Sequence, residues 1–237
     1  NSRTGIFSTF YGQLNLFPGL TFKSSFNINM DFQRIGTYTG KFEGLSRENE
    51  SNLTIINSYK WTWTNILTYD KNLGNHHVLA TVATETRFGL TEQYYQAGQS
   101  LELGEFKWFA IRNSDPSYLI IDNKQNPYIK STMISYIGRL NYSFKEKYLA
   151  TFTGRYDGAS QLVEKWDFFP SVSIGWRISE ENFMKGLEFL SNLKLRVGYG
   201  LTGNSSVSPY GSMGLTTDYP LYYQFGVTEV THYGYRT

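Results

Sequence analysis

The sequence contains no cysteine and carries almost balanced charge, and both features exclude classes of function. Without cysteine the chain has no disulfide framework, no thiolate metal site and no cysteine nucleophile, and the absence fits a protein of an oxidising compartment. Lys and Arg number 22 against 20 Asp and Glu, which gives a net charge of +2, and no basic run occurs. This balance argues against a nucleic-acid binder, whose affinity comes from a concentrated basic face.

Long apolar runs are also missing. The longest span four residues, at 108–111 and 118–121, whereas a membrane-spanning helix needs about 20. The sequence therefore predicts no transmembrane helix. It contains instead 17% Tyr, Phe and Trp, and aromatic residues, like Thr, favour β-strands.

Side chains alternate between apolar and polar over long stretches, which is the period of a β-strand. Between Phe22 and Phe32 most even-numbered residues are apolar and the odd-numbered ones are polar. The sequence predicts eight strands, at residues 5–16, 20–33, 53–69, 76–88, 132–144, 148–157, 168–178 and 193–200. Their connections alternate between short turns (17–20, 70–75, 145–147) and long or intermediate loops (34–52, 89–131, 158–167, and all residues after 200). In the connection 179–192, Ser179 is predicted to cap a short helix that runs through Phe183, Met184, Leu187 and Leu190.

Alternation alone fits two architectures, a membrane β-barrel and a soluble β-sandwich. Strands of at least about 9–11 residues, joined alternately by short and long connections, are typical of outer-membrane barrels. Aromatic residues also fall where interfacial girdles belong. Tyr69, Phe144, Tyr148 and Trp176 lie near predicted short turns, and Trp166 and Phe168 lie near a longer loop. These features favour the barrel.

Several consecutive motifs resemble those of SusC/RagA-like TonB-dependent outer-membrane transporters. They are KYLATFTGRYDGAS (147–160), FFPSVSIGWRISEE (168–181), LSNLKLR (190–196) and YGLTGN (199–204). Upstream, WTWTNILTY (61–69) followed by NHHV (75–78) is similar to an earlier hairpin of the family. Residues 159–165 depart from the commoner Ser-Ser-Arg-Phe type of run. The resemblance covers most of 53–204, and the rest of the chain matches only in pattern.

The resemblance implies an all-β fold, a transmembrane antiparallel β-barrel of about twenty-two strands with short periplasmic turns and long extracellular loops. About eight of those strands lie in this chain. Residues 1–237 are then expected to be part of a single barrel domain, with the plug domain and the barrel ends outside it. Implied partners are a SusD-like surface lipoprotein, TonB-ExbB-ExbD acting through the plug, outer-membrane lipid, and an oligosaccharide or peptide substrate. The implied function is nutrient import across a Gram-negative outer membrane, with no enzymatic activity and no cofactor. The alternative is a secreted, soluble β-sandwich that binds a ligand.

No catalytic, cofactor or metal residue is nominated. Adjacent His76 and His77 point to opposite faces of a strand, and Glu180 and Glu181 are expected to cap a helix. Five cations opposite apolar strand positions are predicted to face the barrel lumen, where they contact either the plug and neighbouring strands or substrate: Arg139, Arg155, Arg177, Lys194 and Arg196. Five aromatic residues of the predicted loop 89–131 are expected to contact a sugar or a partner, or to pack among themselves: Tyr94, Tyr95, Trp108, Phe109 and Tyr118.

Overall fold

The computed structural model describes residues 1–41, 48–102, 104–120, 127–184, 190–204, 207, 210, 217–225 and 228–236, the last two ranges as backbone only. These ranges contain ten strands: β1 Ser2–Phe17, β2 Leu20–Thr39, β3 Glu50–Leu73, β4 His76–Gln99, β5 Tyr128–Phe144, β6 Tyr148–Ala159, β7 Trp166–Arg177, β8 Lys194–Gly200, β9 Thr217–Phe225 and β10 Thr228–Arg236. Short 3-10 segments connect some of them: η1 Gly104–Asn113, η2 Pro116–Tyr118, η4 Ile178–Glu180 and η5 Asn182–Met184. Within the described ranges, no helix has the length and apolarity needed to cross a membrane.

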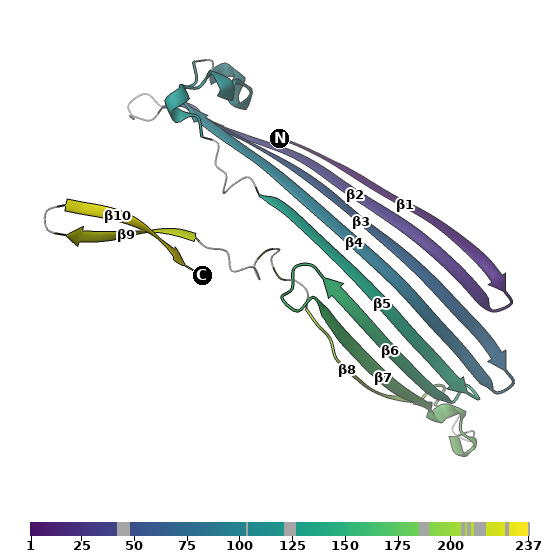
Figure 1. Ribbon diagram of the computed structural model, residues 1–237. Coiled ribbons are helices and arrows are strands. Elements are labelled where there is room, and N and C mark those ends of the chain that lie inside the picture. The colour runs from purple at the N-terminus through teal and green to yellow at the C-terminus, as the bar shows by residue number, and fades with distance from the viewer. Residues whose placement is uncertain are drawn as a thin grey trace.

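Strands β1 to β8 form one antiparallel sheet in which each strand pairs with the next along the chain (Figure 1). β9 and β10 pair separately with each other. The turns β1–β2, β3–β4 and β5–β6 are tight and lie at one end of the sheet. Gly19 and Gly74 sit in the first two with φ of 88° and 61°, a left-handed conformation that glycine adopts without steric cost.

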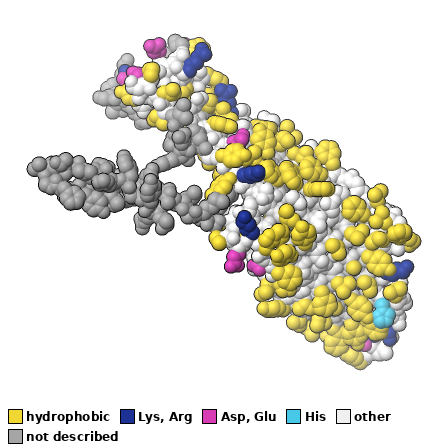
Figure 2. All heavy atoms as spheres, in the orientation of Figure 1, with side chains coloured by type: hydrophobic (Ala, Val, Ile, Leu, Met, Phe, Trp, Pro, Cys, Tyr) yellow, Lys and Arg dark blue, Asp and Glu magenta, His cyan; other side chains and the backbone are white. Residues whose placement is uncertain are grey.

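The register places the apolar alternation of all eight strands on one face. Phe26 lies opposite Trp63, and Trp61 opposite Phe88. Phe152 lies between Leu140 and Val172. Large side chains on this face are open to the surroundings, with Phe152 51% and Ile174 65% exposed, and Figure 2 shows apolar side chains spread over the sheet. A surface of this kind is unfavourable in water but matches the hydrocarbon of a membrane, so this is the lipid-facing side of a barrel wall.

Two aromatic rows border this lipid-facing side. Near the tight turns, the pairing aligns a row made up of His76, Phe144, Tyr148 and Trp176. Toward the other end, Tyr136, Tyr156, Phe168 and Trp166 form the second row. Trp166 and Trp176 are the first and eleventh residues of β7, which corresponds to about 33 Å of strand and, at a tilt of about 40°, to about 25 Å of height. That is the height of the apolar band of an outer-membrane barrel, and the predicted fold class is confirmed.

Several predicted boundaries are wrong. β2, β3 and β4 continue well beyond the second aromatic row, to Thr39, from Glu50 and to Gln99, so the predicted loops 34–52 and 89–131 are much shorter. The residues after Gly200 are not a continuous loop, because β9 and β10 lie there. Ser179 lies inside η4 instead of capping a helix, and no α-helix forms over 178–184. Leu187 lies outside the described residues.

The prolonged strands carry a small core of their own. We call residues 34–39, 50–57 and 92–120 the extension. The Trp108 ring covers Gly36, and a Cβ on that glycine would clash with the ring. Leu53, which pairs with Gly36, is buried, as are Ala110 and Ile111 of η1. Because Gly36 and Leu53 lie on the lipid-facing side of their strands, η1 folds over the outer surface of the sheet.

Candidate functional site

The face opposite the lipid-facing side is polar, and in a closed barrel it lines the interior. Its middle part is dominated by hydroxyl and amide side chains: Ser25, Asn27, Asn29, Thr62, Thr64, Thr81, Asn141, Thr151, Thr153, Ser171 and Ser173. Some bond across strands. The Thr151 hydroxyl donates to Asn141 Oδ1 at 3.0 Å, and Thr9 donates to Asn27 Oδ1 at 2.8 Å. We call this face the luminal face. It offers uncharged donors and acceptors along its height.

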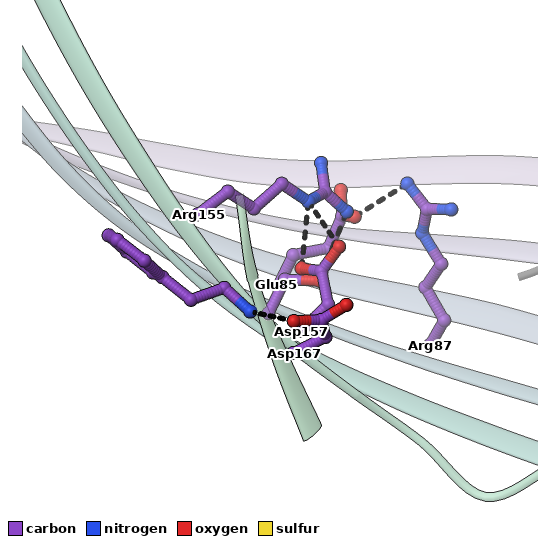
Figure 3. A network of polar contacts seen from close by, with 7 residues as sticks. Glu85, Arg87, Arg155, Asp157 and Asp167 are labelled. Atoms are coloured by element: carbon purple, nitrogen blue, oxygen red, sulfur yellow. Dashed lines mark hydrogen bonds and ion pairs between the residues drawn. The ribbon is translucent and has the colours of Figure 1, made fainter. Parts of the chain in front are cut away.

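Charged side chains gather on the luminal face near the second aromatic row (Figure 3). The register aligns Glu85, Ser135, Asp157 and Asp167 across β4 to β7. Arg155 Nε donates to both carboxylate oxygens of Asp157 at 2.7 Å, and its terminal nitrogen donates to Ser135 Oγ at 3.1 Å. The contacts to Asp157 share the single Nε–H and are charge-assisted, and the bond to Ser135 from a second nitrogen fixes the orientation of the guanidinium.

The remaining carboxylates of this network have separate partners. Arg87 approaches Glu85 Oε1 at 2.6 Å, at ion-pair distance but without hydrogen-bond geometry. The backbone N–H of Phe168 donates to Asp167 Oδ1 at 2.8 Å. Figure 3 shows these side chains turned toward one another above the sheet. This part of the luminal face is close to electrically balanced and is held in place by its own contacts.

The luminal face is basic closer to the tight turns. Arg139, Arg177, Lys194 and Arg196 lie there. Arg139 Nε donates only to the neutral Thr153 hydroxyl at 3.3 Å, and Arg177 reaches Glu146, an 85% exposed turn residue, at 3.7 Å. No carboxylate of the described ranges contacts Lys194 or Arg196. Charge on this face is therefore divided by height, balanced near the second aromatic row and positive near the turns.

All five cations singled out from the sequence lie on the polar face that we call luminal. Among the described residues, only Arg155 has a carboxylate partner within a strand, since the partner of Arg177 is in a turn. Whether the other four contact a plug or a substrate stays a prediction. Sequence reasoning missed Glu85, Arg87, Asp157 and Asp167. Glu85 and Arg87 share one side of an alternating strand, which was a usable signal, but the row across four strands appears only once the register is known.

The five predicted loop aromatics do not converge on one site. Tyr94 and Tyr95 lie in β4, not in a loop, and as neighbours on a strand they face opposite sides. Trp108 and Phe109 lie in η1 on the outer surface, with ring centroids 5.8 Å apart, and Arg34 lies over the Phe109 ring at 4.7 Å. Tyr118 is in η2 and half exposed. Their contact with a sugar or partner stays a prediction.

The two histidines have separate polar partners. His76 Nδ1 lies 2.7 Å from the Tyr142 hydroxyl, and His77 Nε2 lies 2.8 Å from Asp70 Oδ1. Among the described residues no group of three potential metal ligands occurs.

Glu181 ties together the end of the sheet where the tight turns lie. Its carboxylate accepts hydrogen bonds from the Tyr148 hydroxyl at 2.7 Å, the Trp176 indole N–H at 3.2 Å and Lys147 Nζ at 3.1 Å. These hydrogen bonds hold the pKa of the Glu181 carboxyl below its usual value. The bond from Tyr148 has the largest effect, followed by those from Trp176 and Lys147. The expected role of Glu181 in helix capping is wrong, because its side chain joins β6, β7 and the β5–β6 turn.

Comparisons with known proteins place these features in context. The chain is 30% identical over 211 residues to the TonB-dependent receptor P3 of Formosa agariphila, across 87% of this chain and 21% of that protein. It is 50% identical over 80 residues to the TonB-dependent receptor SusC of Bacteroides thetaiotaomicron, across 33% of this chain and 8% of that protein. A structure of the RagAB peptide transporter matches 98% of this chain and 26% of its own chain, with a TM-score of 0.81 and 18% identity.

The matches to P3 and to the RagAB structure cover most of this chain but a small part of each relative. The chain spans about a fifth of the length of the curated relatives that it matches over most of its residues. No profile of a protein family matches it.

Proposed function

We propose that this chain, which is related to the SusC/RagA-like TonB-dependent receptors, supplies part of the barrel wall and mouth of an outer-membrane nutrient importer. The observation that carries the proposal is the one-layer sheet with an apolar band between two aromatic rows on one face and a hydrophilic, charge-ordered lining on the other. A barrel wall needs both properties, since one face meets lipid and the other meets a polar passage.

The wall is only part of the proposed transporter. We propose that the plug domain and the remaining strands belong to other regions of the full-length protein and that 1–237 lies within its barrel domain. The relatives are four to five times longer than the matched segment, which supports this division. Energy for opening the passage then comes from TonB-ExbB-ExbD acting on the plug, and the wall stays as the fixed frame.

The cargo that suits this lining is a hydrated oligomer. Hydroxyl and amide side chains donate and accept hydrogen bonds as sugars and peptide bonds do, so an oligosaccharide or a peptide passes without burying an unpaired polar group. A SusD-like lipoprotein that covers the extracellular mouth is the partner proposed for capture. The related protein SusC and the RagAB transporter support this assignment by likeness.

The alternative of a soluble β-sandwich has no support in the structure. Strands β1 to β8 lie in a single sheet, and between the two aromatic rows their apolar side chains do not meet a second layer among the described residues. In a sandwich these side chains would face each other across about 10 Å.

The test uses the full-length protein in its own cell envelope. Deleting its gene is expected to abolish growth on, or uptake of, one class of oligosaccharide or peptide, and re-supplying the gene restores it. Disabling TonB gives the same loss without removing the protein from the outer membrane. Recovery of the full-length protein with soluble proteins instead of the outer membrane contradicts the proposal.

A further inference from the structure

The lipid-facing side is hollowed at mid-height, between the two aromatic rows. Four residues that pair directly across β4 to β7 form a row at this height: Val82, Gly138, Gly154 and Pro170. Two of these residues have no side chain, so a groove of about 560 Å³ opens here. The side chains that point to this face are apolar apart from one hydroxyl: Ala80, Val82, Leu140, Phe152, Phe168, Pro170, Val172 and Tyr199. Thr81, Arg139, Thr153 and Ser171 also border the groove, but they occupy the alternate strand positions, whose side chains belong to the luminal face.

The two glycines are not explained by the fold itself. Glycine inside a strand destabilises it and often marks a bulge or the close approach of a ligand. The β5–β6 and β6–β7 registers run through Gly138 and Gly154 without a bulge, and neither glycine has a positive φ. A Cβ on Gly138 would meet no atom within 4 Å, and one on Gly154 would meet only the Phe168 ring, at 3.2 Å. A larger residue at 138 therefore fits the wall, but it fills the groove.

The groove is bounded differently at its two ends. Toward the second aromatic row, the Trp166 ring stacks on Tyr156 at 5.0 Å and on Tyr136 at 6.3 Å, which forms a closed cluster of rings. Toward the tight turns, β5 leads from Gly138 to Phe144, a distance of six residues. That is about 20 Å of strand, or about 15 Å of height at the usual tilt, half of a hydrocarbon core of about 30 Å.

A lysine and a histidine stand at the end of this path. Lys145 follows Phe144 in the turn, with Nζ 5.3 Å from the centre of that ring. His76 packs on the same ring at 4.8 Å and contacts the Tyr142 hydroxyl. Cations and aromatic residues together at a membrane interface suit a lipid phosphate.

We propose that the groove is a specific binding site for one acyl chain of a phospholipid of the periplasmic leaflet, whose headgroup phosphate lies beside Lys145. The groove is continuous with the lipid-facing side, and the side chains that point into it carry no charge for a polar ligand. Its distance from the tight turns matches the length of an acyl chain whose headgroup lies beside those turns. An ordinary boundary lipid exchanges freely, whereas a chain seated between Leu140, Phe152 and Val172 is retained. This site depends on the barrel fold and orientation, not on the cargo.

The test is native mass spectrometry of the full-length protein released from lipid nanodiscs that contain phosphatidylethanolamine with 16-carbon chains. The wild type is expected to retain one phosphatidylethanolamine at collision energies that strip the others. Gly138→Leu removes that retained lipid because its side chain occupies the groove. The matched control is Gly12→Leu in β1, since Gly12 shares the lipid-facing side, lies outside the groove and has open space around its Cβ position.

A second variant keeps the outcome decisive if Gly138→Leu fails to insert. Val82→Phe narrows the groove from β4 and is expected to cause the same loss, while Lys145→Gln weakens retention without abolishing it. Equal retention by the wild type and all variants overturns the proposal. A change in subunit number with an unchanged lipid count assigns the groove to a protein contact and also overturns it.

Discussion

The wall between the two aromatic rows and the extension above it solve the same problem in opposite ways. Between the rows, the apolar side chains of the outer face have no covering layer, and large residues such as Val82 and Ile174 are more than half exposed. In the extension, η1 covers that same outer face, and Leu53, Ala110 and Ile111 are buried. The wall therefore depends on lipid as its second layer, whereas the extension brings its own. The same alternating strand pattern is stable in lipid and in water because lipid covers the outer face of the wall and η1 covers the outer face of the extension.

A charge on the outer face of the wall tests this difference most strongly. Val172→Arg places a cation in the apolar band near mid-height and is expected to lower the unfolding free energy in lipid vesicles by about 2–4 kcal/mol, because the charge must leave water. Ser173→Arg, one residue further on the luminal face, is expected to cost less than about 1 kcal/mol. Urea titration monitored by tryptophan fluorescence measures both. Equal losses contradict the assignment of the two faces.

The extension is expected to respond without disturbing the wall. Gly36→Leu drives a side chain into the Trp108 ring, and overpacking of this kind costs about 1–3 kcal/mol. The substitution weakens the contact between η1 and β2, so a protease added to intact cells is expected to cut within residues 104–113 faster. Insertion and heat resistance of the barrel stay unchanged, as they do in Gly12→Leu. Loss of insertion in Gly36→Leu alone contradicts the independence of the two regions.

The luminal face offers a similar contrast between its balanced and its basic part. Arg155→Met leaves the Asp157 carboxylate, 15% exposed, without its guanidinium donor, and a mostly buried carboxylate that loses this donor costs about 1–2 kcal/mol. Arg196→Met removes a cation with no carboxylate partner on the described wall and is expected to change stability by less than about 0.5 kcal/mol. Urea titration of the two variants side by side measures the difference. A larger effect of Arg196→Met indicates an acidic contact supplied by the plug.

How far the sequence predicts this molecule depends on what surrounds each part. Between the aromatic rows, lipid on one side and water on the other impose a strict two-residue alternation, so the strand faces and the position of Arg139 or Arg196 follow from the sequence. Above the membrane both faces meet water or η1, and the alternation fades at residues such as Thr37 and Gln93. For this reason the sequence predicts loops where the strands continue. The Glu85, Asp157 and Asp167 row needs the pairing register, which no single strand contains.

The smallest expected effect concerns Glu181, which fastens β6, β7 and the β5–β6 turn where the wall meets the periplasm. Because the hydrogen bonds from Tyr148, Trp176 and Lys147 lower its pKa in the folded state, its contribution to stability is complete above the ordinary carboxyl pKa and is lost as the pH falls through the lowered value. Glu181→Gln keeps the shape and removes the charge, so its stability is expected to change less between neutral and acidic pH than that of the wild type. Glu180→Gln, in the same segment but outside these three hydrogen bonds, is the control and should follow the wild type. Parallel pH profiles for the wild type and Glu181→Gln would show that lipid alone stabilises this end of the wall. The contrast between a wall stabilised by lipid and an extension stabilised by its own residues would then be sharper.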